Sequence, residues 1–270
     1  MSAAAGSAPE GLPRAIVLTF DNLGEASALQ RGTWDARTPL GQDPSVTRAL
    51  PRVLDELERH ELRATFFVEA INCELNPTAL HAIAERGHEL GVHGWRHEPW
   101  DQLDEVAERE LLGRSTRAFA NAGLPVRAFR PPGGEGTPHT EALLRAHGYG
   151  WWSPVGDAPD VRSELVSVPF AWRLVDAYHL MDRFAELRAQ RGDSAEPVLA
   201  PAMGDQFLRW VSDDAPAVQT VILHPFLTLD ERWLAQVRRL LAALSQLRAA
   251  RRVWVGPGGA FADWLTRRLT

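Results

Sequence analysis

The segment GVHGWRHEPW places two histidines, His93 and His97, just after a short apolar run and with three residues between them. If the chain turns helical after that run, imidazoles at positions i and i+4 lie on one face about 5–6 Å apart, which suits two ligands of one divalent metal. A third oxygen ligand is available in LTFDNLG, residues 18–24. Two imidazoles and one oxygen leave coordination positions open for water and substrate. The pattern therefore predicts a catalytic metal site, with surface or core histidines as the alternative.

Three more polar residues stand at the ends of apolar runs: Asp21, His224 and Arg130. Asp21 has the position of a general base that deprotonates metal-activated water, although turns also use aspartate there. His224, in VILHPF, can protonate a leaving amine, and its alternative role is that of a hydrogen-bonded core histidine. Arg130, in FRPPGG, precedes a rigid proline turn, and its alternative role is an ordinary ion pair.

The elements that position these residues follow from hydrophobic periodicity. Short apolar runs predict buried strands, and segments with apolar residues three and four apart predict helices between them. Such a β-α alternation indicates a mainly parallel sheet with outer helices, whose active site lies beyond the carboxyl ends of the strands. The expected strands cover residues 15–20, 64–70, 88–93, 127–132, 165–170, 218–226 and 251–256, and the helices 44–62, 76–87, 103–123, 174–192 and 229–250. We expect the stretches 134–165 and 192–217 to be long, loop-rich connections.

Composition excludes several kinds of protein. A net charge of −6 argues against a nucleic-acid binder, whose binding surface should be basic. All 29 basic residues are arginine, so no lysine is present to form a Schiff base or to serve a phosphate-binding P-loop. The single Cys73 cannot form an internal disulfide.

The organisation of the chain looks simple. The start, MSAAAGSAPEGLPR, has neither a basic region nor a long apolar run, and no stretch reaches the roughly 20 apolar residues of a membrane span. We expect a flexible tail over residues 1–13, one domain over residues 14–270, and residence in the cytoplasm.

In this order, the motifs resemble those of the polysaccharide deacetylase family, also called the NodB homology domain or carbohydrate esterase family 4. The resemblance runs from about residue 14 to 255. Any one motif is weak evidence, but five in order are strong. They are TFDNLG at 19–24 for the family's Thr-Phe-Asp-Asp-Gly, His93 to His97 for His-x-x-x-His, Arg130–Pro132 for Arg-x-Pro, Ile222–His224 for Leu-x-His, and the strand-like stretches 62–68 and 85–93.

The resemblance implies a deformed (β/α) barrel of 7–8 mainly parallel strands with outer helices, and metal-assisted hydrolysis of an N-acyl amide. It makes Asp21 the base and His224 the general acid, while Arg130 pairs with or steers the base. One divalent ion is implied, with zinc expected and iron, manganese, cobalt or nickel as alternatives. The implied metal ligands are Asn22, His93 and His97.

The chain departs from the family pattern at two sites. Asn22 holds a neutral oxygen where the family has a metal-binding aspartate, which predicts a weakened or altered metal site. The fourth motif, an aspartate followed by Asp-Trp, is not present as such, so the partner of Arg130 is left open between Asp157, Asp160 and neither. The segments 93–100 and 167–181 look closer to the family's intracellular branches, which include allantoinase-like members and aminosugar deformylases.

Aromatic rings suit sugars and other amphipathic ligands, so we expect Trp95, Trp100 and Trp152 to line a substrate pocket. Glu69 is a weaker candidate for holding a polar substrate group. The leading hypothesis is a metal-dependent hydrolase that removes a small acyl group from an aminosugar or specialised metabolite. The alternatives are a metal-independent hydrolase of a cyclic amide or ureide and an inactive ligand-binding homologue. The expected partner is a small N-acylated molecule, and a homodimer is left open.

Overall fold

The computed structural model describes residues 8–213 and 216–269, and both edges of its strand β1 (Ala15–Asp21) are paired. Strand β8 (Val218–Leu223) runs along one edge, while the other is shared by β9 (Trp254–Gly256) near the start of β1 and β2 (Thr65–Val68) near its end. All seven residues of β1 are buried. A parallel strand covered on both faces needs such an apolar run, which is why AIVLTF was recognisable in the sequence.

The sheet continues from β2 through β3 (Glu89–Val92), β4 (Ala128–Phe129), β5 (Trp151–Trp152) and β7 (Leu165–Ser167) to β6 (Asp160–Arg162). Every pairing between these nine strands is parallel except that of β6 with β7. Two isolated bridges, Val155 with Phe170 and Val175 with Ile222, connect the segment after β7 to both ends of the curled sheet. The expected deformed (β/α) barrel is confirmed, as a mostly parallel half-barrel.

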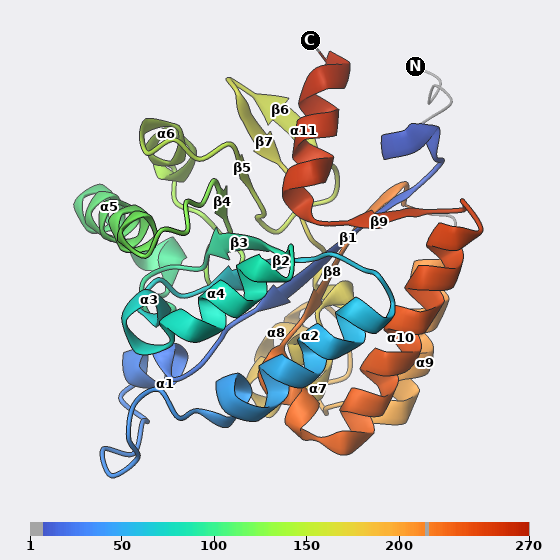
Figure 1. Cartoon of the computed structure of the whole chain (residues 1–270), viewed down its shortest axis with the longest axis horizontal. Coiled ribbons are helices and arrows are strands. Elements are labelled where there is room, and N and C mark those ends of the chain that lie inside the picture. Colours follow the sequence, from blue (N-terminus) through green and yellow to red (C-terminus); the bar gives the residue numbers. More distant parts are fainter. Residues whose placement is uncertain (1–7, 214–215, 270) are drawn as a thin grey trace.

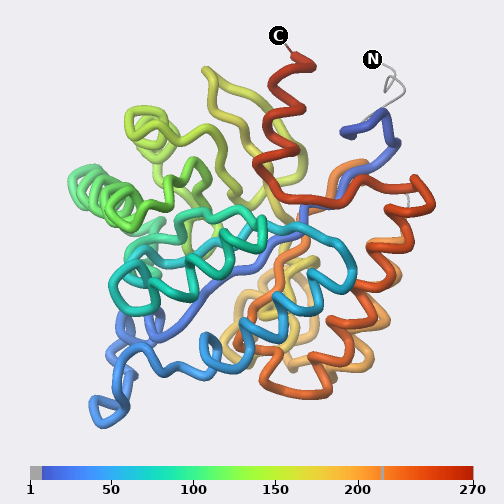
Figure 2. The backbone as a smooth tube through the Cα atoms, in the orientation of Figure 1, coloured from blue at the N-terminus to red at the C-terminus, as the bar shows by residue number. Residues whose placement is uncertain are grey.

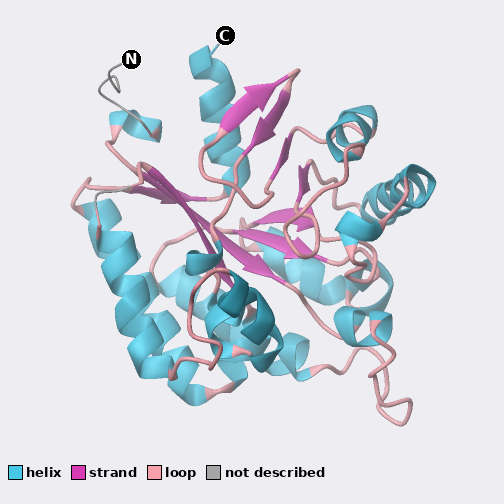
Figure 3. Ribbon diagram, turned by 180° about the vertical axis from the view of Figure 1, so that it is seen from behind, coloured by secondary structure: helices cyan, strands magenta, loops and turns pink. Residues whose placement is uncertain are grey.

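Helices surround this sheet, as Figure 1 and the view from behind in Figure 3 show. They are α1 (Ala26–Gln30), α2 (Leu50–Arg59), α3 (Asn72–Leu75), α4 (Pro77–Glu85), α5 (Glu105–Asn121), α6 (Thr140–Ala146), α7 (Asp176–Leu180), α8 (Ala185–Gln190), α9 (Ala200–Ser212), α10 (Glu231–Ala249) and α11 (Gly258–Leu269). Short turns of 3₁₀-helix lie at η1 (Pro9–Gly11), η3 (Trp100–Gln102), η4 (Trp172–Leu174), η5 (Asp182–Phe184) and η6 (Pro225–Leu229), and a π-turn lies at η2 (Ser45–Ala49). None of the helices in the described part of the chain is long and apolar enough to span a membrane.

All seven expected strands are present, although most are shorter than the apolar runs that predicted them. The stretches expected to be loop-rich connections also contain regular elements: α6, β5 and β6 lie within residues 134–165, and α9 lies within residues 192–217. The expected single helix over 174–192 is divided into α7, η5 and α8, since Met181 has extended backbone angles. Short elements of this kind carry too few residues for a clear periodic signal.

Core contacts begin earlier in the chain than we expected. Ala8 and Leu12 are buried against a core cluster that includes Val17, Trp151 and Phe261. Figure 2 shows this first segment and α11, which carries Phe261, lying close together. The proposed flexible tail over residues 1–13 is therefore wrong for residues 8–12, and its first seven residues lie outside the described part of the chain.

The segment that follows α7 is held by one buried side chain. Arg188, on α8, is 1% exposed and donates to the carbonyl oxygens of Tyr178, Met181, Ser194 and Ala195. Four backbone acceptors are thereby satisfied by one guanidinium, which suits a fork of donors. These hydrogen bonds hold the segment between β7 and α9 in place, and that segment carries residues of the site described below.

Just before β3, His88 is buried with an incomplete set of partners. Its Nδ1 accepts a hydrogen bond from the Ala64 backbone at 3.3 Å, and its Nε2 has no partner in the part of the chain that the structure describes. Burial, together with the positive charges of Arg63 and Arg86, lowers the pKa of His88 to about 4. Between pH 4 and 6.5 the unfolded chain therefore binds a proton that the folded chain does not, so this group makes the protein less stable as pH falls.

We predict that His88→Phe removes this acid sensitivity while keeping a ring against Phe66, whose centroid lies 5.3 Å away. From pH 6.5 down to 4, the free energy of unfolding of the natural protein should fall relative to that of the variant by about 1.4 kcal/mol per pH unit. Urea unfolding at half-unit pH intervals measures this. His81→Phe, on the partly exposed side of α4, is the control and should follow the natural protein. Parallel stability curves for His88→Phe and the natural protein would contradict the prediction.

Candidate active site

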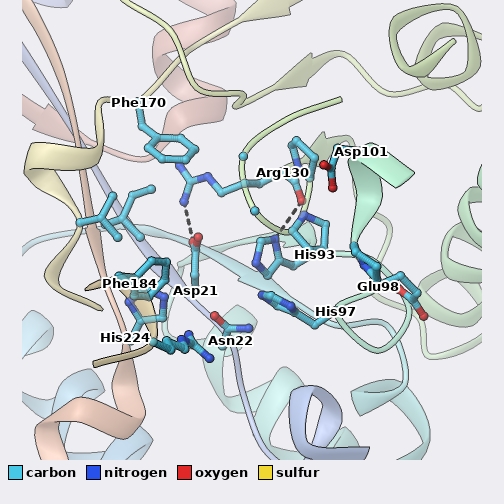
Figure 4. Close-up of a pocket in the computed structure, with 18 of the residues that line it drawn as sticks. Asp21, Asn22, His93, His97, Glu98, Asp101, Arg130, Phe170, Phe184 and His224 are labelled. Atoms are coloured by element: carbon cyan, nitrogen blue, oxygen red, sulfur yellow. Dashed lines mark hydrogen bonds and ion pairs between the residues drawn. The ribbon is translucent and has the colours of Figure 1, made fainter. Parts of the chain in front are cut away.

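A pocket of about 570 Å³ lies at the carboxyl ends of the parallel strands. Its walls come from the ends of β1, β3, β4 and β8 and from the segment between β7 and α8, as Figure 4 shows in close-up. The strand-end residues that the sequence singled out share this pocket: Asp21, Asn22, His93, His97, Arg130 and His224. The expectation that separate strands deliver them to one rim thus agrees with their positions.

Asp21 is held by the guanidinium of Arg130. Arg130 Nη1 donates to Asp21 Oδ1 at 2.5 Å, and the two side chains are 1% and 6% exposed. The same nitrogen donates to Thr19 Oγ1 at 2.9 Å. In the described part of the chain, no donor is bonded to the second carboxylate oxygen, Oδ2, of Asp21. This oxygen is therefore free to accept a proton from a molecule in the pocket.

Arg130 is itself enclosed on several sides. Its Nη2 donates to Ser153 Oγ at 2.8 Å, and its guanidinium carbon lies 4.2 Å from the ring centroid of Phe67 and 5.3 Å from that of Phe170. Burial lowers the pKa of Arg130, although the carboxylate of Asp21 opposes that shift. The bonds of this guanidinium go to Asp21, Thr19 and Ser153. Neither of the partners left open by the sequence, Asp157 and Asp160, takes part in them.

His93 is oriented by the backbone of the neighbouring strand. Its Nδ1 lies 2.9 Å from the carbonyl oxygen of Arg130, which can only accept, so Nδ1 carries the proton and Nε2 presents a lone pair. Burial lowers the pKa of His93 to about 3, which keeps the ring neutral. Burial also lowers the pKa of His97, with a contribution from the positive charge of Arg183. Metal-binding histidines are held in this manner by a second hydrogen bond.

The two rings are near each other, with centroids 5.0 Å apart, but no helix brings them together. Residues 93–99 form a loop in which His97 has a φ of 75°. Glu98 shapes this loop, because its carboxylate accepts from the backbone nitrogens of Trp95 and Arg96 at 2.9 Å each. A Cβ at Gly94 would lie 2.8 Å from Glu98 Oε2, so only glycine fits there. The helical geometry assumed from the spacing was wrong, and a loop folded around Glu98 produces the same proximity.

Asn22 is fixed from behind by Glu69. The Asn22 backbone has a φ of 62°, which asparagine tolerates better than most residues, and its Nδ2 donates to Glu69 Oε1 at 2.6 Å. The other oxygen of Glu69 accepts from the Leu23 backbone at 3.1 Å. With the nitrogen of its amide engaged, Asn22 is left with Oδ1 as the atom that can face the pocket. Burial raises the pKa of Glu69 to about 7. Glu69 is fully buried and does not line the pocket, which corrects its assignment as a substrate-binding residue.

His224 forms a buried pair with Asp176, a residue that sequence reasoning missed. The ring Nδ1 lies 2.6 Å from Asp176 Oδ1, and the backbone nitrogen of His224 donates to Oδ2 at 2.9 Å. Trp233 Nε1 and the Ala177 backbone donate to the same carboxylate at 3.2 and 2.7 Å. Asp176 thus fixes the ring and leaves Nε2 toward the pocket. In the sequence, Asp176 is marked only by the two apolar residues before it in RLV, and many surface acids follow such a pair.

The donors His93 Nε2, a His97 ring nitrogen and Asn22 Oδ1 suit a divalent metal, because two imidazoles and an amide oxygen are ordinary ligands of zinc and similar ions. The orientation of His93 and Asn22 by Arg130 and Glu69 supports this fit. All three donors are neutral, so the set lacks the charge of a carboxylate ligand. Among residues 8–213 and 216–269, no three His, Cys, Asp or Glu side chains gather in a metal-binding group.

The expected tryptophans do not line the pocket. Trp95 and Trp100 are 3% and 0% exposed, the former beneath Arg114 at 3.6 Å and the latter bonded to Glu108. Trp152 lines a separate, more polar hollow. All three lie in the wrong place for the assigned role, because hydropathy alone cannot distinguish a core indole from a pocket indole. The aromatic side chains that do line the pocket are Phe170, Trp172 and Phe184.

Known proteins match this chain in two ways. Sequence comparison matches its first half, and structural comparison matches nearly the whole fold. The family model of polysaccharide deacetylases matches residues 9–152. A segment of 95 residues is 35% identical to the peptidoglycan-N-acetylglucosamine deacetylase PgdA of Listeria monocytogenes, and it covers 35% of this chain. That segment spans only 20% of the length of PgdA.

Solved structures match nearly the full length. A Mycobacterium smegmatis protein provisionally assigned as a polysaccharide deacetylase superposes with a TM-score of 0.83 at 26% identity, covering 99% of this chain and 95% of that one. Puue allantoinase superposes with a TM-score of 0.70 at 17% identity, covering 97% of this chain and 93% of that one. The likeness to the allantoinase concerns the fold alone.

We predict that Asp176→Asn disturbs His224 while leaving the fold in place. The amide offers one acceptor oxygen to donors that now share two, so the free energy of unfolding should fall by about 2 kcal/mol. The proton on His224 should also no longer be confined to Nδ1. Imidazole nitrogen NMR and urea unfolding measure the two effects. Asp182→Asn, an exposed change nearby, is the control. An unaltered His224 spectrum in Asp176→Asn would show that the carboxylate does not set the state of the ring.

Proposed function

The chain belongs to the polysaccharide deacetylase family, and from this premise we propose that it hydrolyses the amide bond of a small N-acylated compound. The products would be the free amine and a small carboxylic acid such as acetic acid. The class of substrate we favour is an aminosugar or another specialised metabolite. One observation supports the proposal above the others: Asp21 and His224 share one pocket, and each is held by its own buried side-chain partner, Arg130 and Asp176 respectively.

In the proposed reaction, Asp21 accepts a proton from water through Oδ2 while the water oxygen bonds to the acyl carbon. Arg130 holds the carboxylate in position through Oδ1 and balances its charge. His224 then donates a proton from Nε2 to the amide nitrogen as the carbon–nitrogen bond breaks, and Asp176 stabilises the charged ring from which that proton leaves. The two groups thus divide base and acid roles within one pocket.

Asn22, His93 and His97 would hold one divalent metal, with zinc expected and iron, manganese, cobalt and nickel as alternatives. A bound metal polarises the acyl carbonyl and makes water more acidic. The contribution of the protein is to present three oriented, neutral donors beside Asp21.

A second candidate function is favoured by the same asparagine. A donor set without a carboxylate binds a metal less tightly, so Asp21 and His224 would act alone in a metal-independent hydrolase of a cyclic amide or ureide. The inactive-homologue alternative accounts less well for the two buried pairs, because burying opposite charges together costs free energy that a simple ligand site does not require. Residence in the cytoplasm remains an expectation from the sequence, and it would direct the search toward small soluble substrates.

We predict that Asp21→Asn lowers turnover of an N-acetylated aminosugar by at least about 10³-fold, because the general base is lost. Acetate release measures the rate, and circular dichroism checks the fold. Asp35→Asn, an exposed aspartate paired with Arg37 outside the pocket, should leave the rate unchanged. Full activity in Asp21→Asn would exclude Asp21 as the base.

Chelation in the same assay separates the proposed functions. Loss of turnover on metal removal, with recovery on adding zinc, would support the metal-dependent hydrolase. Undiminished turnover in metal-free protein would favour the metal-independent one. Failure of the natural protein to hydrolyse any N-acyl or cyclic amide substrate would instead favour an inactive homologue.

We predict that Asn22→Asp tightens metal binding only when Glu69 is changed with it. In the single variant, the new carboxyl group would lie opposite that of Glu69, where a hydrogen bond of 2.6 Å is now formed. Negative charges on both groups would repel each other and destabilise the fold. In the double variant Asn22→Asp with Glu69→Gln, the bond reverses its direction and one negative charge faces the metal. Calorimetric titration with zinc should show affinity about tenfold or more above the natural protein for the double variant. Equal affinities in both would mean that Asn22 Oδ1 is not a ligand.

A further inference from the structure

Two arginines that the proposed reaction does not use, Arg31 and Arg183, line the pocket. Arg31 directly follows α1, the helix that the chain enters after Asn22, and Arg183 lies in η5, shortly after the helix that begins with Asp176. Both are therefore attached to elements that also carry residues of the active site. Their guanidinium groups reach the same cavity from different parts of the chain.

Neither arginine is neutralised by an acidic side chain among the described residues. Arg31 Nη1 donates to Ser27 Oγ at 2.6 Å on its own helix, and the guanidinium carbon of Arg183 lies 5.0 Å from the centroid of the Phe184 ring. In the part of the chain that the structure describes, neither side chain forms an ion pair. Other exposed arginines commonly do, such as Arg37 with Asp35. Two unpaired cations in one pocket stand out in a chain with a net charge of −6.

Arg183 lies on one side of the pocket. Figure 4 shows Phe184 on the side of His224, with Glu98 and Asp101 on the opposite side beyond His93. Arg183 is next to Phe184 in the chain and lies over its ring. The charge of Glu98 is already directed at two backbone nitrogens of its own loop. Of the acids in the pocket wall, Glu98 is thus engaged by its own loop and Asp21 by Arg130, and none of the described acids forms an ion pair with Arg31 or Arg183.

The two guanidinium groups influence each other. Burial lowers the pKa of Arg183, and the positive charge of Arg31 lowers it further. Arg183 also lowers the pKa of His97. The three groups are thus close enough to interact, and like charges held together in a partly enclosed pocket are unfavourable until an anion joins them. The side chain of Arg183 is also partly open to solvent, which moderates this repulsion.

We propose that Arg31 and Arg183 bind an anionic group, a carboxylate or a phosphate, carried by the substrate. Arginine suits this role because its planar fork of donors matches both groups. The inference rests on the proposed function in one respect: His224 protonates the leaving nitrogen, so the part of the substrate nearest His224 is the amine half. The anion therefore belongs to the amine product and not to the acyl group that is released.

The first experiment compares acetylated substrates that differ in charge. N-acetylglucosamine, its 1-phosphate and N-acetylmuramic acid offer no anion, a phosphate and a carboxylate. The natural protein should favour an anionic substrate by kcat/KM at least about tenfold over the neutral one, and the better of the two anions identifies the group. Arg183→Gln and Arg31→Gln should each reduce that preference about tenfold. Arg183→Lys should keep part of it, and Arg37→Gln, outside the pocket, should keep all of it.

The second experiment measures binding without turnover. Calorimetric titration with glucosamine 1-phosphate, glucosamine and acetate tests the amine half and the acyl half of the substrate separately. The phosphate-bearing amine should bind to the natural protein and lose about tenfold in affinity in Arg183→Gln, while acetate should bind equally to both proteins. Raising the salt concentration should weaken the first interaction, since both arginines are partly open to solvent.

The outcomes distinguish this inference from the function on which it rests. Hydrolysis of neutral and anionic substrates at equal rates, unchanged by either arginine variant, would overturn the anion site and leave the hydrolase intact. Arginine-dependent binding of glucosamine 1-phosphate without hydrolysis of any substrate would support the anion site and reject the hydrolase. Arginine-dependent binding of acetate would place the anion on the wrong half of the substrate and overturn the proposal.

Discussion

The buried guanidinium of Arg130 is the interaction on which the site depends. Its side chain joins β1, through Thr19 and Asp21, to Ser153 after β5, and its own carbonyl orients His93. One residue thus fixes the proposed base and one proposed metal ligand at once. An unpaired charge in this position would be costly, so Asp21 and Arg130 have to be retained together. Besides burial, the positive charge of Arg130, which pairs with Asp21, disfavours protonation of His93 nearby. This helps to explain why that ring is neutral.

Much of this arrangement could be predicted from the sequence, because a parallel sheet covered by helices requires continuous apolar runs. Those runs located seven of the nine strands, and the polar residue at the end of each run then had to lie at the rim. Asp21, Arg130 and His224 were predicted on this basis. Asn22 was expected to offer a neutral oxygen to a metal. The group that fixes it from behind, Glu69, was instead assigned to the substrate.

The rest could not be predicted, because it depends on contacts between segments with no shared pattern. Asp176 and His224 are 48 residues apart in the chain. In the sequence, Asp176 does not differ from other acidic residues at the start of a short helix. The loop of His93 and His97 depends on Glu98 turning back onto backbone nitrogens, which spacing alone cannot distinguish from a helix. The tryptophans were misassigned because a ring suited to a sugar is equally suited to a core. Local periodicity reports which face of an element is buried, but not what covers it.

The pairing of β1 on both edges has a consequence for how the chain reaches this structure. Thr19 Oγ1 donates to the carbonyl of Val221, 202 residues further along, and β9 follows later still. During synthesis, β1 would therefore leave the ribosome with an uncovered edge and remain so until almost the whole chain had been made. Long-range parallel pairing of this kind is slow, and open edges invite association with other chains. A molecule stopped after β5 would hold Asp21, His93 and Arg130, yet it would lack both the strand that closes β1 and the histidine that this strand carries.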